Sequence, residues 1–179
     1  WSVANGQIDL AIIGGQLPND LENLLQVIPY ATDELALVLP VKHPLANKKE
    51  LMKEDLYKLN FVTLDSQSTT RKVVDKLLKD SGLDIQRLKI EMELNSLEAI
   101  KNAVQSGLGA SFLPVVSIER ELKGGSIYKP SIADLEVKRE LKLITNPSRY
   151  TSRASEAFKK YILPQFSSSE SPLRQINLI

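Results

Sequence analysis

The 179-residue sequence contains no cysteine and one histidine, His43. Without cysteine it can form no disulfide, no thiolate nucleophile and none of the common zinc modules, a composition that fits a reducing compartment. With a single histidine, a multi-histidine metal site cannot form, and a Ser/His triad would have to use His43. We therefore expect no metal and no other cofactor, and we interpret His43, in a loop before Pro44, as a surface residue.

Long hydrophobic runs are also missing. The longest apolar stretches, residues 10–13 and 35–41, have the length of strands and fall far short of the ~20 residues of a membrane span. The first residues lack the basic region, apolar core and cleavage site of a secretory signal. We therefore expect no membrane partner and a cytoplasmic location. Residues 1–6 resemble the last turn of a helix closed by glycine, which suggests a fragment of a longer protein.

The charge is nearly balanced, with 23 basic and 22 acidic residues, so it neither requires nor forbids a nucleic-acid partner. Apolar residues make up 42% and charged residues 25%, as in an ordinary globular protein of one domain or two small lobes.

Predicted strands alternate with predicted helices along the chain, most sharply between residues 61 and 129. The strand-like runs are residues 8–13, 24–30, 34–41, 61–64, 87–94, 110–113, 127–129 and 137–145. The helical runs are residues 48–58, 71–80, 95–106, 114–124 and 151–163. This order predicts an α/β fold with parallel or mixed sheets and helices on both faces.

The same pattern predicts two lobes. We assign residues 1–45 to part of a first lobe, residues 46–135 to a second lobe, and residues 136–166 to a strand and helix that return to the first. Residues 167–179 contain three consecutive serines and no periodicity, which predicts a mobile tail.

A polar turn after the strand at 61–64 is the best candidate site. It lies between the carboxyl end of a strand and the start of a helix, the edge where ligands bind in open α/β sheets. Unpaired helical N–H groups and the helix dipole favour a small carboxylate or phosphate there. The candidate ligand-binding residues are Ser66, Gln67, Ser68, Thr69, Thr70 and Arg71. The same hydroxyls could instead simply cap the helix.

Two further positions are candidates on weaker grounds. Asn95 and Ser96 begin a second helix after a strand and offer another set of free N–H groups, although capping alone also explains them. Gly14, followed by Gly15, could let the backbone approach a ligand closely, or could form an ordinary turn. The acidic pair Glu91 and Glu93 lies on the solvent side of a strand, with no partner for acid–base chemistry.

Several segments resemble LysR-type transcriptional regulators. Residues 3–12, VANGQIDLAI, are similar to the NGxIDLAI segment of that family, and residues 34–40 with 43–45 are similar to its LxLVxPxxHPL strand. Residues 93–114 resemble its second-lobe strand–helix–strand, and the resemblance runs in order to about Phe166. Residues 1–9, 66–73, 91–96 and 144–150 look like the RuBisCO transcriptional regulator branch of cyanobacteria and algal plastids.

The resemblance implies a two-lobed, periplasmic-binding-protein-like (type 2) effector domain whose first lobe is N-terminally incomplete here. It implies an effector-sensing regulatory domain that controls RuBisCO and carbon-fixation genes and is not an enzyme. It also implies DNA binding through an N-terminal helix-turn-helix absent from this chain, and a homodimer or homotetramer. An algal protein of this kind would be located in the plastid stroma.

The implied effector is a small anionic metabolite of the sugar bisphosphate, phosphoglycolate or 2-oxoglutarate class, bound between the lobes. The residues carried over to that site are Ser66, Gln67, Ser68, Thr69, Asn95 and Ser96, with Gly14 at the rim of the first lobe.

Two alternatives share this architecture. A free-standing solute-binding protein has the same lobes, but the sequence lacks a secretion signal. Prephenate dehydratase has a similar fold with a Thr-Arg-Phe motif, whereas here Thr70 and Arg71 are followed by Lys72.

Overall fold

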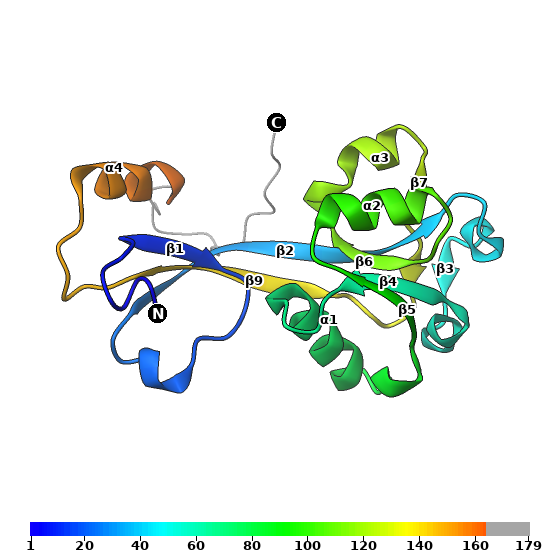
Figure 1. Ribbon diagram of the computed structural model, residues 1–179, viewed down its shortest axis with the longest axis horizontal. Helices are drawn as coiled ribbons and strands as arrows, with labels where there is room; N and C mark the ends of the chain where they lie inside the picture. Colours follow the sequence, from blue (N-terminus) through cyan, green and yellow to red (C-terminus); the bar gives the residue numbers. More distant parts are fainter. Residues whose placement is uncertain (164–179) are drawn as a thin grey trace. The chain divides into compact units, whose positions relative to one another are not determined.

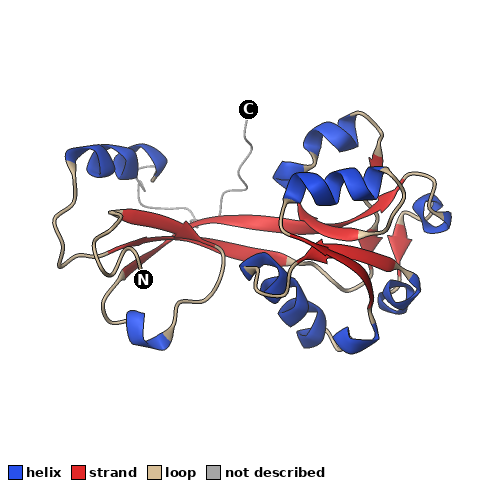
Figure 2. Ribbon diagram, in the orientation of Figure 1, coloured by secondary structure: helices blue, strands red, loops and turns tan. Residues whose placement is uncertain are grey.

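A computed structural model describes residues 1–163 of the protein, and the tail expected at 167–179 lies outside the described residues (Figures 1 and 2). The chain divides into two compact units. Of the described residues, unit 1 contains 1–33 and 139–163, and unit 2 contains 34–138. The chain passes from one unit to the other inside a single long strand, β2 (Gln26–Pro40), where the sequence pattern predicts two strands.

The main sheet of unit 2 forms around β2. The strands β6 (Ser111–Pro114) and β7 (Ile127–Tyr128) both pair with β2 in antiparallel orientation. The strands β4 (Asn60–Leu64) and β5 (Lys89–Leu94) pair in parallel, and a backbone bridge from Phe61 to Ala110 joins β4 to the segment that leads into β6.

Helices cover both faces of this sheet, as Figure 1 shows: α1 (Thr69–Asp80) lies on one side, and α2 (Leu97–Gln105) and α3 (Glu119–Lys123) lie on the other. Alternation along the strands produces the two faces because successive side chains point in opposite directions. Phe61 and Phe112 pack with α1, whereas Val62 and Leu113 pack with α2. The predicted layering of helices on both faces of a mixed sheet is thus present.

The strand β5 changes its buried side part-way along its length. Leu88 and Ile90 pack against the cluster under α1, but Leu94, at an even spacing from them, packs against the cluster under α2. A register shift opposite Phe61 and Val62 inserts one residue into β5, and one extra residue inverts the facing of every side chain beyond it. Met92, predicted to be inward, is therefore 41% exposed.

The predicted helix at residues 48–58 is wrong. This segment contains the short strand β3 (Glu50–Leu51), paired in parallel with β8 (Ser131–Ile132), and then a 3-10 helix at Lys53–Lys58. The capping interaction comes from the Asp55 carboxylate, which accepts from the Met52 N–H. The structure thus has its cap at Met52 and Asp55 and not at Asn47 and Glu50, where the sequence predicts a capping box.

Unit 1 is smaller and less buried. The strand β1 (Leu10–Ile13) pairs in antiparallel orientation with β9 (Lys138–Thr145). Within residues 1–163, the buried apolar cluster of this unit contains Val3, Leu21, Leu25 and Ile144. No helix within residues 1–163 is long and apolar enough to cross a membrane.

The last described helix, α4 (Arg153–Ile162), starts at Ser152, whose hydroxyl accepts from the Ser155 N–H. The sequence predicts an inward apolar face containing Phe158 and Tyr161, but α4 buries no residue, and these two are 47% and 87% exposed. That prediction is wrong because periodicity indicates an apolar face without indicating what covers it.

Candidate functional site

Two polar loops of unit 2 lie side by side at one edge of its sheet. Because β4 and β5 are parallel neighbours, their last residues, Leu64 and Leu94, are aligned, and the two loops begin at adjacent positions. The Asp65 N–H donates to the Leu94 carbonyl at 3.1 Å, which joins the loops directly. The first loop leads into α1 and the second into α2, so the two helix N-termini start from the same edge, where helix ends favour anions.

Residues 65–70, which we call the hydroxyl corner, take their shape from Asp65. Its carboxylate accepts from the Gln67 N–H at 2.8 Å and its carbonyl accepts from the Ser68 N–H at 3.0 Å, a compact Asx-type turn. The Lys72 ammonium lies 3.4 Å from the Gln67 amide oxygen. Asp65 belongs to the polar turn predicted as the site, but it was not among the predicted ligand-binding residues, and its role in shaping the turn was not predicted.

The hydroxyls of Ser66, Ser68 and Thr69 do not cap α1. Ser68 occupies the N-cap position, but its side chain makes no capping hydrogen bond. The first backbone N–H that donates along the helix is that of Lys72, which bonds to the Ser68 carbonyl. The side chains of Ser66, Ser68 and Thr69 make no hydrogen bond with any of residues 1–163, and neither does that of Asn95. A simple capping role therefore does not explain this cluster.

Ser96 behaves differently from those four residues. Its hydroxyl accepts from the Ala99 N–H at 3.5 Å and so caps α2, as the alternative interpretation proposes. Ser66, Gln67, Thr69, Asn95 and Ser96 are all exposed. The predicted polar set in unit 2 thus forms one accessible surface over two adjacent helix starts.

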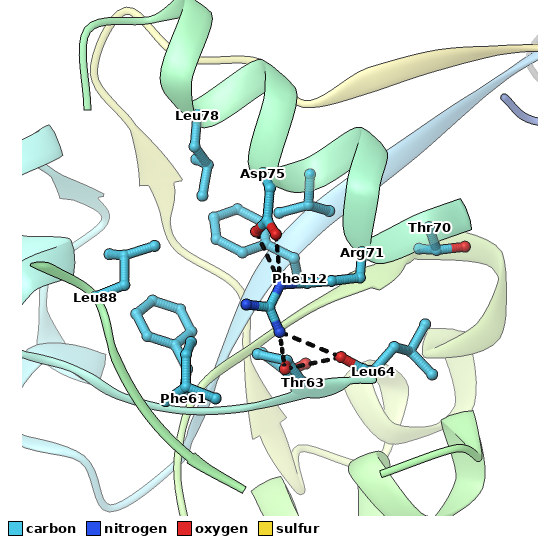
Figure 3. A pocket seen from close by; sticks show the side chains of 12 residues that line it. Phe61, Thr63, Leu64, Thr70, Arg71, Asp75, Leu78, Leu88 and Phe112 are labelled. Carbon is cyan, nitrogen blue, oxygen red and sulfur yellow. Dashed lines mark hydrogen bonds and ion pairs between the residues drawn. The ribbon is translucent and has the colours of Figure 1, made fainter. Parts of the chain in front are cut away.

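Arg71 directly follows the hydroxyl corner, and its side chain is 15% exposed. Figure 3 shows it between Asp75 on α1 and Thr63 and Leu64 at the end of β4. Its Nε donates to the Asp75 carboxylate at 2.8 Å, and its Nη1 donates to the hydroxyl of Thr63 and, at 3.2 Å, to the Leu64 carbonyl. The same Nη1 lies 3.3 Å from Glu93 Oε1.

A small cavity of about 30 Å³ lies under the first turns of α1 (Figure 3). Apolar side chains, including Phe61 and Phe112, line most of it, and its polar lining consists of Thr63, Thr70, Arg71, Asp75 and Ser111. This volume accommodates one or two water molecules and no metabolite. This cavity is therefore too small to be the site of a metabolite.

The remaining predicted residue, Gly14, directly follows β1 in unit 1. A side chain at this position would come within 3.1 Å of Arg139 and Leu141. The Arg139 and Leu141 side chains would have to shift slightly to admit it, and the role of Gly14 in binding stays a prediction.

The partners of Arg71 were missed by sequence reasoning. Asp75 could have been found, because a residue four positions along a helix lies on the same face. Thr63 and Glu93 could not, since their contact depends on the pairing of β4 with β5. No group of three or more metal-ligating side chains occurs within the described part of the chain.

A model of the LysR substrate-binding domain matches residues 1–167. The chain belongs to this family. A probable RuBisCO transcriptional regulator of Synechocystis sp. is 60% identical over 167 residues, which are 93% of this chain and 48% of that protein. One from Porphyra purpurea is 57% identical over 93% of this chain and 52% of its own length. The chain spans about half the length of the curated relatives it matches.

Among solved structures, the LysR-type fold is found in the regulatory domain of CcmR from Synechocystis PCC6803, in complex with 2-PG. That structure is similar with a TM-score of 0.77 at 25% identity, over 90% of this chain and 74% of that chain. The predicted fold class, a periplasmic-binding-protein-like effector domain, is thereby confirmed.

Proposed function

We propose that this chain is the effector-sensing part of a LysR-type transcriptional regulator that controls RuBisCO and carbon-fixation genes. The relatives at 57–60% identity are named as probable RuBisCO transcriptional regulators, which supports a regulator over an enzyme. The intact protein would bind DNA through a separate helix-turn-helix and act as a homodimer or homotetramer. The intact regulator would be located in the same compartment as the genes it controls, which is the cytoplasm of a cyanobacterium or the stroma of a plastid.

The observation that carries this proposal is the group of unpartnered polar side chains over two helix N-termini in unit 2. Ser68, Thr69 and Asn95 offer donors with no competing bond in the described chain, and the helix dipoles attract negative charge. The proposed site comprises Ser66, Gln67, Ser68, Thr69, Thr70, Asn95 and Ser96, and Arg71 directly follows Thr70. Its ligand is a small anionic metabolite such as a sugar bisphosphate, 2-phosphoglycolate or 2-oxoglutarate.

The proposed mechanism is a shift of population between two states of the intact regulator. A ligand shifts such an equilibrium only by its difference in affinity for the two states. The hydroxyl corner contributes to that difference if it binds the anion more tightly in one state of the regulator than in the other. A tenfold difference in affinity corresponds to about 1.4 kcal/mol, and a complete switch needs several times that value.

The test is calorimetric titration of the full-length protein with 2-phosphoglycolate, ribulose 1,5-bisphosphate and 2-oxoglutarate. We expect the double variant Ser68→Ala/Thr69→Ala to weaken binding of the preferred anion about tenfold or more, because two hydrogen bonds to a charged ligand are lost. DNA binding and the circular dichroism spectrum should not change.

A matched control is Ser106→Ala. This substitution removes a serine hydroxyl at the C-terminal end of α2, away from the proposed site. This control should bind as the wild type does. Equal affinities for wild type and double variant, or no binding of any of these anions by the wild type, would defeat the proposal.

A further inference from the structure

Arg71 connects three elements through one guanidinium group. It pairs with Asp75 on its own helix α1, donates to Thr63 and the Leu64 carbonyl at the end of β4, and reaches Glu93 near the end of β5 (Figure 3 shows the first three). A planar guanidinium with several fixed donors can hold such partners together, whereas an ammonium group acts as a point charge.

These contacts lie at the base of both polar loops. The hydroxyl corner, which consists of the loop residues 65–68 and the first two residues of α1, begins after Leu64 and ends before Arg71, so the same guanidinium holds both of its ends. Glu93 lies two residues before Asn95 and ties the second loop to the same point. Closing a loop at a fixed geometry restricts the conformations of the residues within it.

The charges around Arg71 argue against contact with an anion. Two carboxylates, Asp75 and Glu93, surround one guanidinium, so this cluster carries a net negative charge. An anion that touched Arg71 would have to compete with both carboxylates and would be repelled by them.

We infer that Arg71 is a positioning residue: it holds the hydroxyl corner beside the Asn95–Ser96 loop and acts on the effector through these loops, without touching it. This inference rests on the proposed function for the identity of the site. It goes further by assigning a role opposite to the one that the residue type suggests, since an arginine beside a helix N-terminus is ordinarily taken for an anion ligand.

The substitution Asp75→Asn separates the two roles. If Arg71 contacts the anion, loss of a competing carboxylate frees the guanidinium, and 2-phosphoglycolate binds more tightly. If Arg71 is a positioning residue, loss of the Asp75 carboxylate lets the Arg71 side chain move, so the two loops are held less firmly. We then expect the affinity for 2-phosphoglycolate to fall about tenfold. Removing the negative charge of Asp75 by itself reduces the repulsion of an anion and favours its binding. A weaker affinity therefore cannot come from the change in charge.

The control for this substitution is Asp80→Asn, the same chemical change on an exposed residue at the end of α1. Calorimetry on the full-length protein should give wild-type affinity for this control. Tighter or unchanged binding by Asp75→Asn overturns the inference.

A second measurement needs no ligand. Hydrogen–deuterium exchange of the full-length protein is compared for wild type, Arg71→Met and Arg71→Lys, which keep most of the side chain over the cavity that Arg71 lines. We expect exchange at residues 65–68 and 95–97 to become about tenfold faster in both variants, with residues 76–80 unchanged. Three results would overturn the inference. Exchange in both loops could stay at the wild-type rate, or exchange could rise equally throughout α1. The third is an Arg71→Lys variant whose loops exchange at the wild-type rate.

The two measurements fail in different ways. If the wild type binds none of the anions, the proposed function fails, while the exchange experiment still decides whether Arg71 orders the two loops. If binding occurs and Asp75→Asn strengthens it, the proposed function stands and the positioning role fails.

Discussion

At the scale of single residues, buried charges in unit 2 lie where periodicity predicts none. Lys101, on the buried side of α2, pairs with Glu98 at 2.6 Å and Glu121 at 3.0 Å, and the hydrogen bond that its ammonium donates to Glu98 is the main cause of its raised pKa. Apolar spacing predicted Ile100 and Val104 as inward-facing but gave no reason to expect a lysine there. A long aliphatic stem with a paired head explains its burial.

Asp55 supports a prediction about acid stability. Its side chain is 7% exposed, and the hydrogen bond from Lys58 at 2.7 Å is the main reason why its pKa is below the ordinary value of 3.8. A lowered folded-state pKa adds stability that is present above pH 3.8 and disappears as the pH falls through the folded value.

We therefore expect Asp55→Asn to lower the free energy of unfolding by about 1–2 kcal/mol at neutral pH. This deficit should shrink as the pH falls below 3.8. Urea unfolding at a series of pH values measures it, with Glu54→Gln, an exposed neighbour, as the control. A deficit that stays constant down to the acid transition would contradict this role of the carboxylate.

At the scale of elements, the close approach of β4 to the segment before β6 depends on a glycine. A Cβ on Gly109 would lie 2.7 Å from the Asn60 carbonyl oxygen, which itself accepts from the Ala110 N–H at 2.7 Å. Neither backbone group can move without weakening the link between the two strands that carry Phe61 and Phe112.

Gly109→Ala should accordingly destabilise the protein by about 1–3 kcal/mol, the usual cost of overpacking a tight site. The variant Gly107→Asn is the control, because its position is open and has a left-handed backbone that asparagine tolerates. Denaturant midpoints compare the two, and a Gly109→Ala protein as stable as the wild type would refute the steric argument.

The elements also indicate how far the sequence predicts the structure. Alternation correctly predicted β5, but no local signal predicts the extra residue that turns Met92 outward, because a bulge depends on the partner strand. The helix α1 and its polar corner were predictable from apolar spacing and turn residues. The proximity of that corner to Asn95 was not, since it requires the parallel pairing of β4 with β5.

At the scale of the whole molecule, burial is unequal. The two clusters of unit 2 contain thirteen and eight buried apolar residues, whereas the cluster of unit 1 contains four. Unit 2 therefore has the larger hydrophobic contribution to stability, which scales with the apolar area removed from water. The whole proposed site except Gly14 belongs to unit 2. The two loops of the site therefore begin at the ends of well-packed strands.

The most direct test of the proposed site is a crystal structure of the full-length protein with 2-phosphoglycolate, or with whichever anion binds best in calorimetry. We predict ligand oxygens about 2.7–3.2 Å from the Ser68 and Thr69 hydroxyls and from backbone N–H groups at the start of α1. An anion bound at saturation somewhere else, with the hydroxyl corner facing only solvent, would contradict the account.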